Sequence, residues 1–298
     1  KVGYSAWTNP FNGVKSYVSY RDTRLIVFWS KNPEALLKEG GLLDYIQGKG
    51  INTYIHFTLN DYVTEGLEKG VPHVEQRIAT FKRLVDRLGF GRVIWRFDPL
   101  ILTDLISVEA LIRKARRIGN ELKGYTEKMV FSIADIAAYR KVRANLVNNN
   151  INYREFSEHD MLQFAAGIQT LNQDWGYELA TCGEKIDLDS FGVVHNKCID
   201  DDLIIKHFSS DARLMDYLGV EISEGDLFNP EKTIVKHRNN KDKGQRQFCG
   251  CIVSKDIGEY NTCAHLCEYC YANSSKATAL RNLQAHKANP QAETIIGK

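Results

Sequence analysis

TYIHFTL (53–59), VEQRIATFKRLVDRL (74–88) and RVIWRF (92–97) are three successive runs whose patterns decide the fold. The first and third are short, apolar and rich in β-branched and aromatic residues, as buried strands are. In the second, apolar residues recur at steps of three and four, and Gly89 stands where a helix C-cap belongs. A strand, a helix and a strand in this order predict a βαβ unit with a right-handed crossover.

The same alternation continues on both sides of this unit. An Asn-rich stretch over 145–152 predicts a loop or an insertion. The fold class is therefore α/β, and either a partial or complete (β/α) TIM-like barrel or an open doubly wound sheet satisfies the pattern. No GxGxxG follows a strand, which disfavours a dinucleotide-binding version. Further strands are predicted over 25–29, 129–133 and 177–181, and further helices over 33–47, 108–122 and 159–175.

Composition narrows the class of protein. The chain has 298 residues, and 39 Lys and Arg against 37 Asp and Glu leave a formal charge of +2, too small to indicate a polyanionic partner. No apolar run approaches the ~20 residues that span a membrane, so we expect no membrane association. No signal peptide is visible, and because the chain starts at Lys1 without Met, we expect an N-terminal piece to be absent. Seven cysteines in a chain of this length favour metal or redox use in the reducing cytoplasm over a disulfide framework.

The composition shifts at Lys236. The run KHRNNKDKGQR (236–246) is basic and polar, and a cysteine-rich segment follows it. We therefore predict a barrel body over 1–235 and a cluster-binding segment over 236–298, ending in a surface tail or one helix. The basic run is interpreted as a solvated loop, or else as a surface that neutralises a cluster or binds a phosphate-bearing substrate such as nucleic acid.

The segment CAHLCEYC (263–270) carries the strongest functional signal. Its cysteines, Cys263, Cys267 and Cys270, stand at a CxxxCxxC spacing. Three thiolates on one tight loop hold three irons of a 4Fe–4S cluster and leave the fourth iron open. An open position distinguishes catalytic metal sites from closed structural ones; this rule, stated for zinc, is carried to iron by analogy. Zinc held by the three cysteines and His265, or inert thiols, are the alternatives.

Four further cysteines equal the ligand number of one more closed site. Cys249 and Cys251 form a CxC pair around Gly250. Together with Cys182 and Cys198 they predict a second metal site, either a second 4Fe–4S cluster or zinc. The alternative is that Cys182 and Cys198 are small core residues, because free cysteine is often buried.

The pattern CxxxCx(aromatic)C, read as Cys263, Cys267, Tyr269 and Cys270, resembles the cluster loop of the radical S-adenosylmethionine (radical SAM) enzymes. The resemblance implies that the open iron binds the amino and carboxylate groups of S-adenosylmethionine and that Tyr269 packs beside the cluster. It also implies a reductant such as flavodoxin or ferredoxin, and it favours a partial or complete barrel. In that superfamily the loop normally follows the first barrel strand, so its position here implies a circularly permuted barrel.

Longer stretches resemble a bacterial family known only as a domain of unknown function, whose C-terminal cysteines are similar to the radical SAM cluster loop. This resemblance covers nearly the whole chain. The stretches that carry it are FWSKNP (28–33), WRFDP (95–99), DIG (256–258) and YNTC (260–263).

Polar residues stand at the ends of successive predicted strands, where barrel enzymes form their active sites. Arg96 lies within an apolar strand and needs a partner, for which Asp98 or Glu184 is the candidate; the alternative is a purely structural ion pair. Asn32 precedes Pro33 and also suits a helix cap. We predict Arg96, Asp98, Lys31 and Glu184 as catalytic residues, and Tyr269, Asn32, Thr58 and Ser132 as cofactor-binding residues.

Two classes of function follow from these patterns. The first is a radical SAM-like enzyme acting on an unknown substrate held at the strand ends. The second is a nucleic-acid-binding module without turnover, stabilised by zinc or by a structural iron–sulfur cluster; an electron-transfer protein with two clusters ranks last. A fourth protein ligand at the triad, such as His265 or Cys251, would favour the second class. The first class requires the cysteine loop to lie near the C-terminal ends of the strands.

Overall fold

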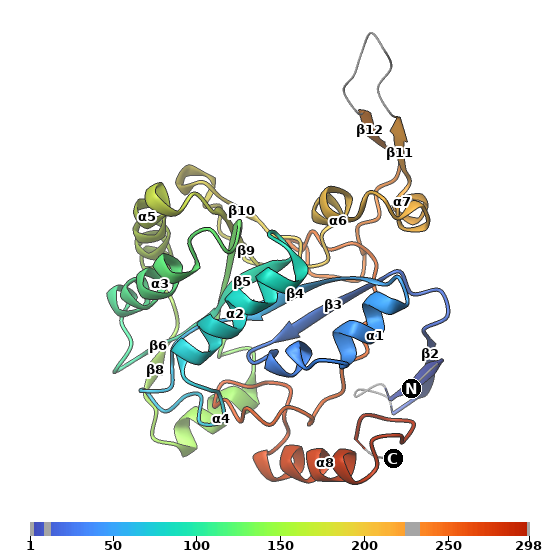
Figure 1. Cartoon of the computed structure of the whole chain (residues 1–298). Coiled ribbons are helices and arrows are strands. Elements are labelled where there is room, and N and C mark those ends of the chain that lie inside the picture. The colour runs from blue at the N-terminus through green and yellow to red at the C-terminus, as the bar shows by residue number, and fades with distance from the viewer. Residues whose placement is uncertain (1–2, 9–12, 224–232, 297–298) are drawn as a thin grey trace.

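A computed structural model describes residues 3–8, 13–223 and 233–296. Its centre is a six-stranded sheet in which every pairing is parallel. The strands stand in the order β10-β9-β7-β5-β4-β3 (Figure 1). They comprise β3 (Leu25–Ser30), β4 (Asn52–Thr58), β5 (Val93–Leu100), β7 (Lys128–Ile133), β9 (Glu178–Thr181) and β10 (Val193–His195).

Neighbouring strands follow one another along the chain, without the reversal of order that a doubly wound sheet contains. In the described part of the chain no pairing joins β3 to β10, so these two strands form the edges of an open sheet. The predicted α/β class with parallel strands is confirmed at this level. All the carboxyl ends of the strands meet at one edge of the sheet, which is where the site described below lies.

Helices cover one face of the sheet (Figure 1). Alternate strand residues such as Ile55, Phe57 and Trp95 point to this face and form the main core with the helices. The helices α2 and α3 begin and end at the residues that the apolar periodicity predicts, 74–88 and 108–122. The elements on this side are η1 (Glu34–Leu37), α1 (Leu42–Gly48), α2 (Val74–Leu88), α3 (Val108–Leu122) and α5 (Glu158–Trp175).

The opposite face is covered by α6 (Asp201–Phe208) and α7 (Ala212–Leu218). Tyr54, Ile94 and Val130, which alternate with the residues of the first face, pack against these two helices. Because both faces are covered, the inner strands β4, β5, β7 and β9 are buried along most of their length, which explains their nearly continuous apolar runs.

Two sequence predictions about elements need correction, and a third agrees with the structure. The single helix expected over 33–47 is two short ones, because Gly40, with φ of 64°, and Gly41 separate η1 from α1. The loop expected over 145–152 begins only at Asn149, because α4 (Arg140–Asn148) extends into the Asn-rich stretch. The expected helix in the C-terminal tail exists as α8 (Lys276–Ala288).

None of the helices in the described chain is both long and apolar enough to cross a membrane.

Small elements complete the described chain. The hairpin of β11 and β12 extends away from the sheet beyond α7 (Figure 1). The remaining elements are β1 (Tyr4–Thr8), β2 (Lys15–Ser19), β6 (Leu102–Thr103), β8 (Tyr153–Arg154), η2 (Asp189–Phe191), β11 (Val220–Ser223) and β12 (Thr233–Lys236).

Candidate functional site

Polar side chains connect the carboxyl ends of β3, β4 and β5. Lys31, directly after β3, donates from Nζ to Oδ1 of Asn60 at 3.0 Å. Asn60, which follows β4, donates from Nδ2 to the carbonyl oxygen of Asp98 on β5 at 3.1 Å. Two of the predicted strand-end residues, Lys31 and Asp98, are therefore joined through one buried amide.

The triad loop, residues 263–270, lies against the segment that follows β4. Gly70 donates its backbone N–H to the carbonyl of His265 at 3.0 Å, and Glu268 donates its N–H to the carbonyl of Leu67 at 2.9 Å. A Cβ at Gly70 would lie 2.7 Å from the carbonyl oxygens of Ala264 and His265, so this close approach requires glycine. The triad loop consequently lies near the C-terminal ends of β3 and β4.

A buried carboxylate connects this loop to the strand ends. Glu68 is fully buried and forms ion pairs with Lys31 at 2.9 Å and with Arg77 at 3.7 Å. The hydroxyl of Tyr269 donates to the same carboxylate. Burial alone would raise the pKa of Glu68, but the charges of Lys31 and Arg77 outweigh burial and hold that pKa below its usual range.

The three thiols of the triad loop differ in exposure. Cys263 is exposed, Cys270 is half-buried and Cys267 is buried. Burial raises the pKa of Cys267 to about 12, and the charge of Lys31 acts in the opposite direction. Leu266, between the first two cysteines, has φ of 54°, a left-handed conformation that is unusual for leucine and that tightens the loop.

His265 and Cys251, the two residues considered as a fourth protein ligand at the triad, both have contacts elsewhere. Nδ1 of His265 lies 3.2 Å from the carbonyl oxygen of Gly70, and burial lowers the pKa of this imidazole. Cys251 lies instead with Cys198, whose backbone N–H donates to its Sγ at 3.2 Å.

The other four cysteines lie close together and are called the four-thiol group. Its members are Cys182, Cys198, Cys249 and Cys251. Cys182 directly follows β9, and its Sγ lies 3.4 Å from Sγ of Cys198 in the segment after β10. Cys249 and Cys251 come from the C-terminal segment and are buried against Cys198. The structure thus gathers the cysteines predicted for a second metal site, although no three sulfur atoms of described cysteines lie within 4.8 Å of one another.

Nitrogen donors point at the sulfur atoms of the four-thiol group. Arg96 donates from Nη1 and Asn196 from Nδ2 to Sγ of Cys198, each at 3.2 Å. The backbone N–H of Ile199 donates to Sγ of Cys251 at 3.4 Å. These contacts suit sulfur atoms that carry negative charge.

Arg96 also pairs with Asp98, which is one of the two partners that the sequence predicts for it. Its Nε donates to Oδ2 of Asp98 at 2.9 Å, and Nη2 donates to the same oxygen. Its guanidinium carbon lies 4.2 Å from the ring centroid of Trp29, whose ring lies 4.7 Å from that of His56. Arg96 therefore contacts a carboxylate, a thiol and an aromatic face at the same time, and its charge is mostly compensated.

Glu184 is not the partner of Arg96. Its Oε1 accepts a hydrogen bond from the backbone N–H of Ile133 at 2.9 Å, and burial raises its pKa. Ser132 does join the Arg96 group, because its hydroxyl donates to Oδ2 of Asp98 at 3.4 Å. Oδ1 of Asn32 accepts from the N–H of Glu34 at 3.4 Å, but Asn32 is not the cap of η1, whose N-cap is Pro33. The side chain of Thr58 is buried, and its carbonyl accepts from Arg77 at 3.4 Å.

Several site residues escape sequence reasoning. Glu68 and Arg77 are charged residues in a loop and on a helix, and nothing in their local pattern indicates that both are fully buried. Trp29 and His56 alternate with core residues on their strands. This alternation only weakly indicates that the two side chains lie on the same face of the sheet. Asn196 follows β10, the strand that the sequence analysis did not predict.

The basic run after residue 235 is held largely by acidic neighbours. Lys236 forms an ion pair with Asp201, and His237 pairs with Glu221 at 3.1 Å. The guanidinium of Arg246 packs against Gly183, where a Cβ would lie 2.6 Å from it. Most residues of the run are exposed, in line with the interpretation of the run as a solvated loop.

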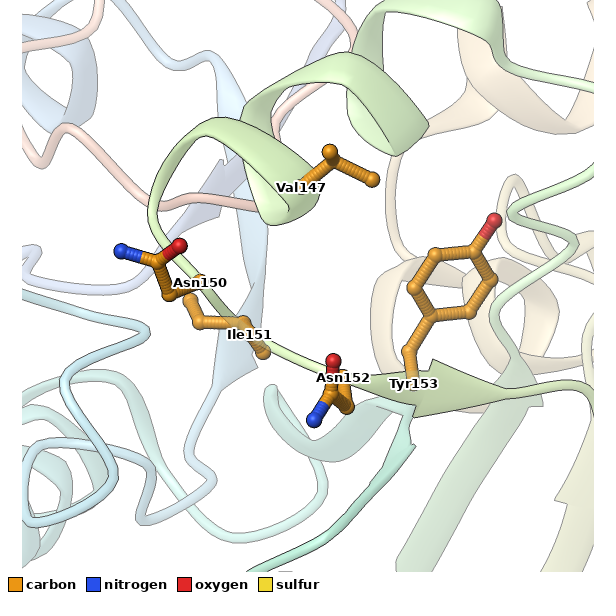
Figure 2. Close-up of a pocket in the computed structure, with 5 residues that line it drawn as sticks. All are labelled: Val147, Asn150, Ile151, Asn152 and Tyr153. Atoms are coloured by element: carbon orange, nitrogen blue, oxygen red, sulfur yellow. The ribbon is translucent and has the colours of Figure 1, made fainter.

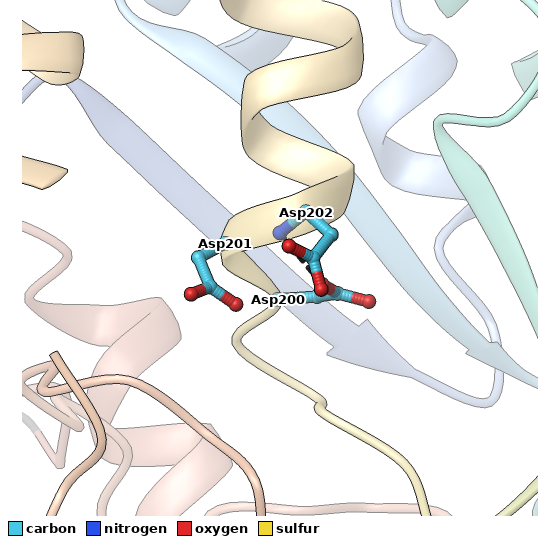
Figure 3. A group of neighbouring side chains, drawn as sticks. All are labelled: Asp200, Asp201 and Asp202. Carbon is cyan, nitrogen blue, oxygen red and sulfur yellow. Dashed lines mark hydrogen bonds between the residues drawn. The ribbon is translucent and has the colours of Figure 1, made fainter. Parts of the chain in front are cut away.

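Two further features lie outside the cysteine groups. Asp200, Asp201 and Asp202 gather at the start of α6 (Figure 3), but Asp200 caps the helix and the others pair with Lys197 at 2.8 and 2.6 Å. A surface cavity of about 630 Å³ lies beside the end of α4 and is lined by Val147 and residues 150–153 (Figure 2). Neither feature contains a cysteine or an uncompensated carboxylate that would extend the site.

The chain matches the model of one protein family over residues 1–272, and that family is described as "Domain of unknown function (DUF1848)". The matched range includes all seven cysteines, since the last is Cys270, whereas α8 lies beyond it. No curated protein and no solved structure matches the chain.

Proposed function

The chain belongs to this DUF1848 family, and we propose that it is a radical SAM-like iron–sulfur enzyme whose cluster is held by Cys263, Cys267 and Cys270. The observation that carries the proposal is the division of the seven cysteines into three and four. Because the four-thiol group is assembled separately, no cysteine remains as a fourth ligand for the triad loop. Three thiolates and an open iron are the arrangement that such an enzyme needs.

The surroundings of the triad loop fit a cluster with an exchangeable ligand. Lys31 and Arg77 bring two positive charges near the loop, and Glu68 offsets only one of them. The charge of Lys31 opposes the rise in the pKa of Cys267 that burial causes, because an opposite charge nearby stabilises the ionised form. When bound, the cluster supplies the electron that cleaves the sulfonium of S-adenosylmethionine.

The residues of the chain then position and shield this chemistry. The side chain of Lys31 is mostly buried, and its ammonium, fixed by Glu68 and Asn60, is suited to bind a ligand carboxylate. The ring of Tyr269 is buried beneath the loop and lies 5.4 Å from Nζ of Lys31, measured to the ring centroid, which places an aromatic wall next to the cysteines. Trp29, His56 and Arg96 lie together on the other face of the sheet, the side of Tyr54 and Ile94, where the exposed ring of Trp29 could contact a substrate.

The alternative of a nucleic-acid-binding module is less well supported. It depends on the basic run, whose first two residues are paired with carboxylates and whose Arg246 packs against the backbone. The pairing with carboxylates removes Lys236 and His237 from the charge available to a phosphate backbone.

Product analysis tests the proposal. Anaerobically reconstituted and dithionite-reduced protein is incubated with S-adenosylmethionine, and 5′-deoxyadenosine and methionine are quantified by liquid chromatography and mass spectrometry. We expect both products from the wild type and from the control Ser274→Ala, an exposed position at the same loop. Cys267→Ser should lose at least about tenfold in product, because the cluster then lacks one of its ligands. Absence of 5′-deoxyadenosine from wild-type protein with a full iron complement would contradict the proposal.

A further inference from the structure

We propose that Cys182, Cys198, Cys249 and Cys251 form a second, closed metal centre in which four thiolates bind zinc or a 4Fe–4S cluster. This centre does not depend on the chemistry proposed for the triad loop. The four cysteines come from three separate segments, namely the ends of β9 and β10 and the C-terminal segment.

The alternative is that these cysteines are ordinary small core residues. Core cysteines are surrounded by apolar groups, whereas Cys198 receives hydrogen bonds from a guanidinium and an amide, both at 3.2 Å. Burying such polar donors is costly unless they find good acceptors, and a neutral thiol is a weak one. A metal-bound thiolate is a strong acceptor, so two donors aimed at this sulfur suit a cysteine that binds a metal.

Two sulfur atoms of the group lie close enough to bind one metal. Sγ of Cys182 lies 3.4 Å from Sγ of Cys198, and without a metal the two groups share a hydrogen bond. When both are thiolates, their charges repel each other strongly in a buried setting, and the single charge of Arg96 is shared with Asp98. A thiophilic metal would supply the compensating charge.

The backbone of Cys198 is fixed by side chains that do not touch its sulfur atom. The hydroxyl of Tyr54 donates to its carbonyl oxygen at 2.7 Å, and Nε2 of His56 lies 2.6 Å from the same oxygen. Outer contacts of this kind orient metal ligands and hold them in place. Two residues of β4 thus act on a single ligand of the proposed centre.

Four protein ligands make the proposed centre closed, in contrast to the triad. Zinc–sulfur bonds of about 2.3 Å correspond to sulfur–sulfur distances of about 3.8 Å, and the pair Cys182–Cys198 is close to that value. The set as a whole is wider than a single-ion tetrahedron, because no three of the sulfur atoms lie within 4.8 Å of one another. Four thiolates are the ligand chemistry that zinc and a 4Fe–4S cluster share.

The test separates the two cysteine groups in the full chain. The triad is removed by Cys263→Ser, Cys267→Ser and Cys270→Ser together, and zinc, iron and acid-labile sulfide per chain are then measured. We expect about one zinc, or about four iron with matching sulfide, to remain, and X-ray absorption to show a sulfur-only protein ligand shell. Either metal supports the proposal, and a triad-free protein that retains neither overturns it.

The reciprocal variant provides the matched comparison. Cys249→Ser with Cys251→Ser should remove the metal that the triad-free protein retains and leave the metal of the triad loop. Ser254→Ala, an exposed position three residues further along, serves as the control. If the double variant keeps the complete metal complement of the wild type, the proposal is wrong. If it does not fold, the triad-free protein still decides the question, and failure of the triad chemistry alone would leave this centre unaffected.

Discussion

At the scale of single residues, Glu68 determines the electrostatics of the site. Its carboxylate is fully buried between Lys31 and Arg77 and accepts a hydrogen bond from Tyr269. Removing one partner of a buried ion pair leaves the other charge uncompensated in a medium of low dielectric constant. No local sequence pattern predicts this residue, because it lies in a loop and its partners come from a strand end, a helix and the triad loop.

Glu68→Gln is expected to lower the free energy of unfolding at pH 7 by about 3–5 kcal/mol, because it leaves Arg77 buried without its carboxylate. Urea unfolding monitored by circular dichroism measures this change. Glu75→Gln is the matched control, because Glu75 and its partner Arg117 are both largely exposed and such pairs contribute about 0–1 kcal/mol. Equal effects of the two substitutions would contradict this account of Glu68.

The stabilising effect of Glu68 should also depend on pH. Its folded-state pKa lies below the unfolded value, so its stabilisation is present above the unfolded pKa and is lost as pH falls through the folded pKa. The difference in unfolding free energy between wild type and Glu68→Gln should therefore shrink as pH falls below about 4.5. A difference that stays constant from pH 7 to pH 3 would show that the carboxylate charge is not responsible.

Arg96 is a second residue-scale case, for which the sequence predicted a partner correctly. The planar guanidinium contacts Asp98, Cys198 and the ring of Trp29 together, which a lysine ammonium is unable to do. Arg96→Lys should lower the free energy of unfolding by about 1.5–3 kcal/mol through lost charged hydrogen bonds. It should also reduce the metal retained by the triad-free protein, which elemental analysis measures; unchanged retention would separate Arg96 from the four-thiol group.

At the scale of elements, the sequence predicted long periodic helices well and short ones poorly. α2 and α3 begin and end where the apolar spacing indicates, because a long amphipathic pattern is specific. α6 and α7 are only 8 and 7 residues long and were missed, since so few residues carry little periodicity. The expected helix over 33–47 is interrupted where Gly40 and Gly41 allow the chain to turn.

The packing of α3 against α5 gives an element-scale prediction. A Cβ at Gly119 of α3 would lie 2.4 Å from the ring of Trp175, which is buried and hydrogen-bonded to Asn120. Gly119→Ala should therefore lower the free energy of unfolding by about 1–3 kcal/mol through overpacking. Gly48→Ala in α1 meets no atom within 4 Å and should be neutral or slightly stabilising, by up to about 1 kcal/mol. Thermal or urea unfolding of the two variants checks the contrast, and a neutral Gly119→Ala would contradict it.

At the scale of the whole molecule, the sequence predicts the division of the cysteines into three and four, and the structure brings the predicted four together. The spacing of Cys263, Cys267 and Cys270 is local and could be recognised in the sequence. The assembly of Cys182 with Cys251 joins residues 69 positions apart and depends on where β9 and β10 end. The alternation of strands and helices fits both a barrel and a doubly wound sheet, and the resemblance favours a barrel; the structure shows a six-stranded parallel sheet whose strands follow chain order.

The whole-molecule arrangement also places both cysteine groups near the carboxyl edge of one parallel sheet. The triad loop lies by the ends of β3 and β4, and the four-thiol group lies by the ends of β9 and β10. Arg96 and Asp98 lie on β5, one of the strands that separate these two pairs of strands in the sheet. Parallel sheets bind ligands at this edge, which makes the space between the two groups the expected place for a substrate.

The most direct test of the central claim is electron paramagnetic resonance of the anaerobically purified, dithionite-reduced protein carrying Cys249→Ser and Cys251→Ser, recorded with and without S-adenosylmethionine. This variant leaves the triad loop as the only group with three cysteines, and wild-type protein is measured beside it. The account predicts the signal of a reduced 4Fe–4S cluster that changes when S-adenosylmethionine is added, because the ligand binds the open iron. A cluster signal that S-adenosylmethionine leaves unchanged in both proteins, or stoichiometric zinc without any cluster signal, would contradict it.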